Sequence, residues 1–338
     1  MCKLFQMRRV VLIPLSLVLS IGGAGMVHPA ASSRTLVVVN KLGDTLAFFD
    51  PATNTRLTTI PLPTHPHEIA VASDGRTAYV SIYGDGVYGR NEHPGHTIEI
   101  VDLAKREKLG EIDLGTFRAP HAMAFDPAGR LWVACDASSA VVVIDTSTRE
   151  VVGSISTAST GSHWLVMLPD GRKAYTSNKD TTHMSVLDVA SMKMTGTISM
   201  PNGSDGLTTT RDGRRLYVAD LKEPLLHVID TTTDREIQSV ALKGRPMRVR
   251  LTPDERYALT SDSGAGVVEI IDIETLTWKG QVPVGKSPMG FAFPGPAHRA
   301  FVTNHNDGTI SLIDPDALSL ITTFPTDAGP ETMVLVGE

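Results

Sequence analysis

Short apolar segments recur at regular intervals along this chain, and turn-forming residues separate them. The stretch from Pro120 to Ile155 contains one complete unit. Its apolar segments span residues 122–125, 131–134, 141–144 and 151–155, with Gly, Pro, Asp and Ser between them. Segments of this length that are rich in β-branched and aromatic residues predict β-strands. Four such strands in succession predict one blade of a β-propeller.

An aspartate follows the third predicted strand of each unit and therefore counts the units. It recurs seven times, as Asp50, Asp102, Asp145, Asp188, Asp230, Asp272 and Asp314. The predicted second strands, from 37–40 to 301–304, also number seven. A fixed period of this length is typical of a repeat architecture. The sequence therefore predicts an all-β, seven-bladed propeller of four-stranded blades over residues 32–338.

The two ends of the repeat region are incomplete in complementary ways. The region begins near Leu36 with a strand of the second type, and it ends with a lone strand of the first type at 332–336. We expect the C-terminal strand to complete the N-terminal blade, which ties both ends into one sheet and removes an open edge. A ring closed in this way needs no partner to cover edges, so we expect a monomer.

The first 31 residues are typical of a secretory signal peptide. Lys3, Arg8 and Arg9 precede an apolar run from Val10 to Ile21, and small residues follow it, with cleavage expected between 24 and 31. An uncleaved membrane anchor is the alternative, although the run is short for a spanning helix. We expect a periplasmic or secreted protein with no stable membrane span after processing.

Processing makes the chain more acidic and leaves it with one thiol. The formal net charge is −6, and removal of the three basic residues of the leader and no acidic ones gives −9. This charge argues against nucleic acid as a partner. Of the two cysteines only Cys135 remains, so no intrachain disulfide can form. Cys135 is either a buried small apolar residue or, alternatively, a metal ligand or nucleophile.

The second-strand motifs resemble those of a known family. Phe301-Val-Thr-Asn304, together with 79–81 and 175–178, resembles the repeat of the YVTN-repeat β-propellers of the exported bacterial type. Ile82, Cys135, Asp220 and Asp262 stand where that motif has asparagine. The resemblance covers residues 32–338 and implies the propeller fold. It implies little about activity, because propellers carry many unrelated functions.

One position at the start of each predicted first strand carries polar residues suited to metal binding. After a first interval of 54 residues every interval is 42, and the positions are His67, His121, His163, Asp205, Met247, Met289 and Glu331. In a closed ring these positions converge on the axis, with the three histidines between the two carboxylates. Imidazoles and carboxylates suit zinc, iron, copper or manganese.

We therefore predict one transition metal ion on His67, His121 and His163. Asp205 or Glu331 is expected to complete the shell or to act as a general base. Two alternatives remain: an inert channel lined by polar residues and water, and a ring whose next residue faces the axis instead. That competing ring contains Glu68, Ala122, Trp164, Gly206, Arg248, Gly290 and Thr332, and no coherent chemistry is expected of it.

Most other histidines map to the same face of the predicted ring. The interval between the first two counting aspartates is nine or ten residues longer than the others, and the extra residues fall in the loop 83–96. An insertion in one loop of a regular repeat usually marks the functional face. We assign as substrate contacts or parts of a lid His65, His93, His96, Arg248 and His305.

Two hypotheses about function follow. The first is a metal-dependent hydrolase, lactonase or lyase that acts on a small-molecule substrate above the channel, with a redox enzyme slightly less favoured. The second is a non-catalytic periplasmic binding or accessory propeller for a redox system, with a periplasmic protein as partner. A non-covalent haem or quinone site is a third interpretation. Covalent c-type haem is excluded, because the chain has no Cys-x-x-Cys-His motif.

Overall fold

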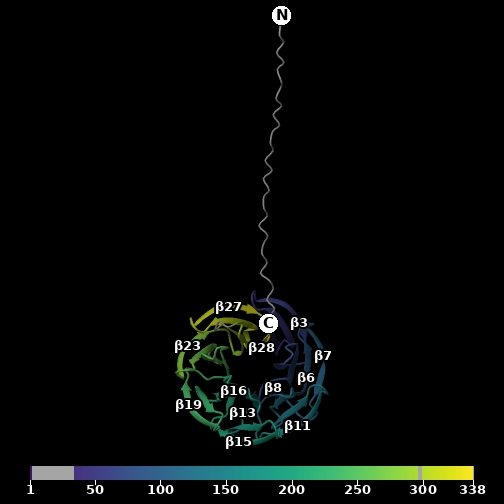
Figure 1. The fold of residues 1–338 in the computed structure, drawn as a ribbon, viewed down its shortest axis with the longest axis vertical. Coiled ribbons are helices and arrows are strands. Elements are labelled where there is room, and N and C mark those ends of the chain that lie inside the picture. The colour runs from purple at the N-terminus through teal and green to yellow at the C-terminus, as the bar shows by residue number, and fades with distance from the viewer. Residues whose placement is uncertain (2–33, 296–298, 338) are drawn as a thin grey trace. The chain divides into compact units, whose positions relative to one another are not determined.

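The computed structural model describes Met1 and residues 34–295 and 299–337. Apart from Met1, the predicted signal peptide lies outside this part of the chain. The chain divides into two units, Met1–Ala31 and Ser32–Glu338. The described part of the second unit forms seven four-stranded antiparallel sheets arranged in a ring (Figure 1). The predicted all-β, seven-bladed propeller is confirmed.

Each blade places its four strands in order from the centre of the ring to the rim (Figure 1). The innermost strands are β4 (Pro66–Val71), β8 (Pro120–Phe125), β12 (Ser162–Met167), β16 (Ser204–Thr209), β20 (Arg248–Leu251), β24 (Pro288–Ala292) and β28 (Pro330–Val336). The second strands are β5 (Thr77–Gly84), β9 (Leu131–Cys135), β13 (Lys173–Asn178), β17 (Arg215–Asp220), β21 (Tyr257–Asp262), β25 (Ala300–Asn304) and β1 (Thr35–Asn40).

The two outer strands of each blade follow the same order. The third strands are β6 (Pro94–Asp102), β10 (Ala140–Asp145), β14 (His183–Asp188), β18 (Leu225–Asp230), β22 (Val267–Asp272), β26 (Thr309–Asp314) and β2 (Thr45–Asp50). The fourth strands are β7 (Glu107–Asp113), β11 (Glu150–Ser156), β15 (Lys193–Ser199), β19 (Arg235–Ala241), β23 (Thr277–Pro283), β27 (Ser319–Pro325) and β3 (Thr55–Pro61).

Helical structure is nearly absent from the described residues. The one helix among them is the short 3-10 turn η1 (His305–Asp307), after β25. Over the same residues, no helix has the length and apolar character needed to cross a membrane.

The C-terminal strand closes the ring as the sequence predicts. Strand β28 pairs antiparallel with β1, with Leu36 opposite Leu335 and Val37 opposite Val334. One blade is therefore built from both ends of the repeat region, in the order β28-β1-β2-β3. This pairing covers the edge that β1 would otherwise expose.

The hydrophobic core lies between neighbouring blades. In one interface Val37 and Phe48 pack with Ala78 and Val80 of the next blade, and all four are fully buried. Because each sheet packs both faces on its neighbours, the edge of its innermost strand faces the axis of the ring. Side chains from both faces of that strand can therefore reach the central channel where the strand begins.

The counting aspartates have a structural role. Each accepts a hydrogen bond from a backbone N–H two or three residues later, in the turn to the fourth strand, as Asp50, Asp102, Asp145, Asp188, Asp230, Asp272 and Asp314. Such a local bond stabilises the turn backbone without help from other blades. The recurrence of aspartate at this position thus reflects turn chemistry rather than a functional site.

Neighbouring innermost strands approach one another closely at Gly206. Its N–H donates to the Met247 carbonyl at 2.9 Å, and a Cβ on Gly206 would lie 2.7 Å from the Arg248 Cα. We predict that Gly206→Ala lowers the free energy of unfolding by about 1–3 kcal/mol, because the backbones must separate. The measurement is urea unfolding, with Gly196→Ala in β15 as control, where only Val186 lies near, at 3.9 Å. Equal effects of both substitutions would contradict the prediction.

Candidate functional site

The repeat brings six of the seven ring positions to one cavity at one end of the channel. The cavity, which we call the upper chamber, has a volume of about 690 Å³, within the range of small-molecule sites. The ring residues that line it are His67, His163, Asp205, Met247, Met289 and Glu331. His121 lies behind this lining and is fully buried.

The three ring histidines lie side by side. The ring centroids of His67 and His121 are 4.3 Å apart, and those of His121 and His163 are 3.6 Å apart. Within the described residues, neither ring nitrogen of His121 has a hydrogen-bond partner. Native proteins seldom leave a buried polar atom in that state, so an unpaired buried imidazole is a marker of a ligand site.

Burial keeps two of these imidazoles neutral. It lowers the pKa of His67 to about 4, with the nearby Lys41 ammonium as the next cause. Burial, followed by the neighbouring histidines His163 and His67, lowers the pKa of His121 well below its usual value. A neutral imidazole offers a nitrogen lone pair, the form of histidine that binds metals and haem iron.

A compact group of potential metal ligands contains two of the predicted histidines and one unexpected carboxylate. One ligand atom each from His67, Glu68 and His121 lies within 4.8 Å of the others. Ligand atoms on one tetrahedral zinc ion lie roughly 3.3 Å apart, so a small side-chain movement would close this set. His163 stacks on His121 but is not part of this group, which therefore differs from the predicted three-histidine set.

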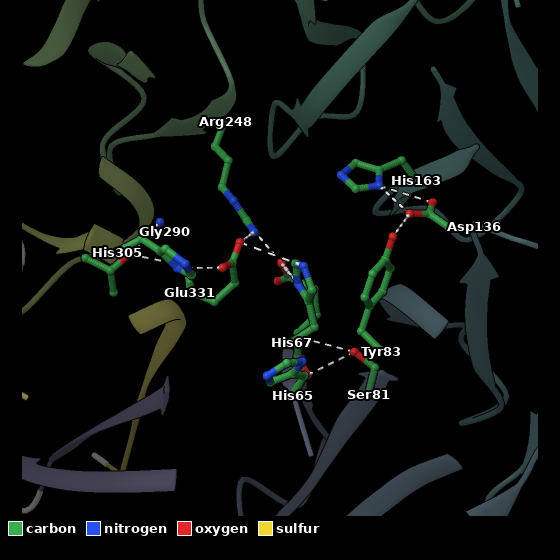
Figure 2. Close-up of polar contacts among 12 residues, drawn as sticks. His65, His67, Ser81, Tyr83, Asp136, His163, Arg248, Gly290, His305 and Glu331 are labelled. Atoms are coloured by element: carbon green, nitrogen blue, oxygen red, sulfur yellow. Dashed lines mark hydrogen bonds and ion pairs between the residues drawn. The ribbon is translucent and has the colours of Figure 1, made fainter. Parts of the chain in front are cut away.

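The expectation that the competing ring has no coherent chemistry is wrong. Arg248 of that ring forms an ion pair with Glu68 at 2.6 Å. It forms a second ion pair with Glu331 at 2.9 Å (Figure 2). Its guanidinium also lies over the Trp164 ring, 4.6 Å from the centroid. Arg248 is predicted to bind substrate, but its side chain is buried and both of its ion pairs are with carboxylates of the protein.

The buried layer formed by Arg248, Glu68 and Glu331 divides the channel into two cavities. Glu68 and Trp164 line a second cavity of about 300 Å³, together with Arg250. Arg248 lines the upper chamber. The ion pairs of Arg248 thus form the floor of the upper chamber, and they hold the Glu68 carboxylate in place beside His67.

The two predicted catalytic carboxylates are both held by cations. Glu331 accepts from Arg248 and lies 3.0 Å from the His305 Nδ1 (Figure 2). Burial raises the pKa of Glu331, but the nearby His67, the His305 hydrogen bond and the charges of Arg248 and Lys41 hold it well below the usual value. Asp205 lies 3.2 Å from the Lys179 amine and 3.7 Å from the His163 Nε2.

A hydrogen-bonded chain behind His163 was not predicted from the sequence. The Tyr83 hydroxyl donates to Asp136 at 2.9 Å, and the His163 Nδ1 lies 2.9 Å from the same oxygen (Figure 2). A carboxylate at Nδ1 fixes the orientation of a histidine and leaves Nε2 for chemistry. The one signal in the sequence was that Asp136 lies two residues after the predicted second strand 131–134.

The predicted substrate and lid histidines divide into two pairs. His65 and His305 line the upper chamber. His93 and His96 do not line it, and they pair with Asp85 and Asp113 on the surface, with side chains 79% and 45% exposed. For this second pair the assignment as substrate contacts is not supported by the geometry.

The inserted loop reaches the chamber through other residues. Gly86, Val87 and Tyr88 at its tip line the cavity, and the Tyr88 ring lies edge-on to His163 at 6.0 Å. The Tyr88 hydroxyl packs so closely against Gly161 that a side chain there would displace it. The loop thus covers one side of the chamber over His163.

Cys135 has no part in this chamber. It is fully buried in an apolar cluster with Leu131 and Val133, and burial raises the pKa of its thiol. A thiol in this state is a poor nucleophile. Of the two interpretations of Cys135, the geometry favours the buried apolar residue.

Comparison with known proteins supports the fold. Residues 100–250 match the family model of YNCE-like beta-propellers. No curated protein matches the chain by sequence. The match covers less than half of the chain and does not test the resemblance to YVTN repeats.

Two solved structures share the architecture at low sequence identity. A chain of Kuenenia stuttgartiensis hydrazine synthase has a TM-score of 0.66 and 20% identity, over 80% of this chain and 89% of that one. A chain of the dihydro-heme d1 dehydrogenase NirN in complex with DHE has a TM-score of 0.66 and 15% identity, over 88% of this chain and 74% of that one. At such identity the likeness to these structures concerns the fold alone. By sequence, the chain is similar to YNCE-like propellers over its central 151 residues, 100 to 250.

Proposed function

We propose that the upper chamber binds one transition metal ion through His67, His121 and Glu68. We further propose that the protein uses the ion for hydrolysis or elimination on a small molecule, as a hydrolase, lactonase or lyase. The observation that carries the proposal is the buried His121, which has no hydrogen-bond partner among the described residues and lies in a group with two other potential ligands. The ion would be zinc, iron, copper or manganese, since nitrogen and oxygen ligands suit all four.

The surroundings supply the other parts that such chemistry needs. A bound ion supplies Lewis acidity and lowers the pKa of a coordinated water. Arg248 fixes the Glu68 carboxylate at 2.6 Å, as outer partners of metal ligands commonly do. His163, oriented by Asp136, presents its Nε2 toward Asp205 at the chamber wall and can hold or move a proton there.

Metal titration of chelator-treated protein tests this proposal. We predict that the wild type binds one equivalent of Co²⁺ or Zn²⁺, measured by calorimetry and by the visible absorption of Co²⁺. His67→Ala, His121→Ala and Glu68→Gln should each weaken binding by at least tenfold, because each removes a ligand. His93→Ala and His96→Ala are the matched controls, since both side chains lie on the surface away from the chamber.

The controls decide how a negative result is read. If the wild type binds no metal, the metalloenzyme proposal fails. If His121→Ala binds metal as tightly as His96→Ala while circular dichroism shows both folded, the ligand set is wrong. Glu68→Gln keeps the shape of the side chain, so it separates loss of a ligand from loss of packing.

A second candidate is a non-catalytic propeller that carries a cofactor for a redox system. It is favoured by the neutral imidazoles of His67 and His121 beside a cavity of about 690 Å³. The similar chain of NirN is described in complex with DHE, which bears on that protein and is consistent with a cofactor site on this fold. Addition of haemin to the purified protein should then produce a Soret band that is absent in His121→Ala.

A further inference from the structure

We propose that the upper chamber binds a small organic carboxylate with an apolar body, with its carboxylate at Lys41 and its body against Leu42 and Val87 at the chamber mouth. This inference names the substrate class for the proposed function and rests on it for the chemistry. Binding of the carboxylate itself needs no metal, so the two can be tested separately.

Lys41 is a buried cation without an anionic partner. Its side chain lines the chamber, the residue is 3% exposed, and its ammonium lies over the Tyr83 ring, 4.7 Å from the centroid. Among the described residues, no carboxylate oxygen lies within ion-pair distance of this amine. The backbone N–H of Lys41 donates to the Gly329 carbonyl at 2.7 Å, which fixes the residue at the wall.

The other cations that line the chamber already have partners. Lys179 pairs with Asp205 at 3.2 Å, and Arg248 pairs with Glu331 and with Glu68. Among the residues that the structure describes, three lysine and arginine side chains line the chamber, and Lys41 is the one left for a ligand. An anionic group of a ligand would complete the pattern that Lys179 and Arg248 already follow.

The environment of Lys41 makes an incoming anion favourable. Burial lowers the pKa of Lys41, because an unpaired ammonium in a poorly solvated site is costly, and the Glu331 and Glu68 charges only partly oppose this. A carboxylate at hydrogen-bond distance would remove that cost. Glu331 would not compete with the ligand for Lys41, because Arg248 and His305 already hold it.

The mouth of the chamber is apolar, unlike its floor. Leu42 and Val87 line it and are 53% and 58% exposed. Met247, Met289 and Leu221 continue this apolar wall. Exposed apolar side chains grouped at a cavity mouth mark a binding site, and here they adjoin an unpaired cation. The ligand that matches both features has an apolar body and one anionic group.

Calorimetry with octanoate on metal-free protein tests this inference. We predict that octanoate binds at least tenfold more tightly than 1-octanol or octylammonium, which share its chain and differ in charge. Lys41→Met should remove that preference and leave the affinity for 1-octanol unchanged, since methionine is unbranched, only one atom shorter than lysine, and uncharged. Lys286→Met is the matched control, because Lys286 is also a lysine but its side chain is 82% exposed and does not line the chamber.

Each outcome has a defined reading. Equal affinities for octanoate and 1-octanol, preference for octylammonium, no binding of octanoate, or an unchanged preference in Lys41→Met would overturn the inference. Because the protein is stripped of metal first, carboxylate binding can succeed where metal binding fails. Octanoate binding without metal binding would support the carboxylate site and reject the metalloenzyme proposal. Metal binding without octanoate binding would support the metal site and reject this substrate class.

Discussion

A chain that ends at Gly329 is expected to lose the cooperative folding of the ring. The deletion removes β28, the innermost strand of the blade that both ends of the repeat region build. It exposes the edge of β1 and removes Met333, which is buried with Leu36 and Val38. Truncation of one buried methionine to alanine costs about 2–5 kcal/mol. Loss of the whole strand is therefore comparable with the total stability of about 5–15 kcal/mol typical of a native protein.

Thermal unfolding followed by circular dichroism measures this effect. A chain that ends at Val336 keeps all of β28 and is the matched control. We expect a sharp transition in the control and a broad or absent one in the shorter chain. A synthetic peptide of residues 330–336 added in excess should restore part of the transition, because it can pair with β1. A sharp transition at the same temperature in both chains would contradict the closure of the ring by β28.

Arg248→Met is expected to lower the free energy of unfolding by about 3–5 kcal/mol, because it leaves buried carboxylates without their cation. Glu68 and Glu331 are buried and lie 2.6 and 2.9 Å from the guanidinium. Methionine fills much of the same space, so the expected loss of stability reflects the unpaired carboxylates rather than a cavity. Addition of Glu331→Gln to Arg248→Met should recover part of the loss, since it removes one of the two stranded charges.

Arg172→Met is the matched control for this substitution. Arg172 also pairs with a carboxylate, that of Asp170 at 2.7 Å, but its side chain is 84% exposed. Exposed ion pairs contribute about 0–1 kcal/mol, so we expect little change on urea unfolding. If Arg248→Met is no more destabilised than Arg172→Met, the buried layer is not a stabilising element of the chamber floor.

The fold could be predicted from the sequence because its evidence is local and repeated. Each unit carries its own strand pattern, and its aspartate makes a turn hydrogen bond within a few residues, as Asp145 does with Ser147. The closure of the ring followed from the incomplete units at the two ends. The convergence of His67, His121 and His163 followed from equivalent positions in a closed ring.

The chemistry of the chamber was less predictable, because it depends on contacts between blades. Glu68 and Arg248 come from different blades and pair across the channel, which no spacing in the sequence indicates. The prediction that their ring has no coherent chemistry assumed that one residue per strand faces the axis. Each blade presents an edge to the axis, so consecutive residues on both faces of an innermost strand reach the channel.

The loop residues were predicted by type but not by position. His93 and His96 are predicted as site residues because they lie in the inserted loop, yet both pair with nearby carboxylates on the surface. Tyr83 was within the same loop segment and was passed over, although its hydroxyl reaches Asp136. The path of an inserted loop is set by its packing on other blades, and the sequence pattern of the loop does not reveal it.

The metal content of the full-length protein, purified as its host produces it, is the most direct test of the proposed metal site. The protein would be purified without a histidine tag and without chelators, and its metals measured by elemental mass spectrometry. We predict close to one equivalent of zinc, iron, copper or manganese per chain, which His121→Ala loses while it stays folded. A chain without such a metal, both as purified and after incubation with all four ions, would rule out the proposed metal site.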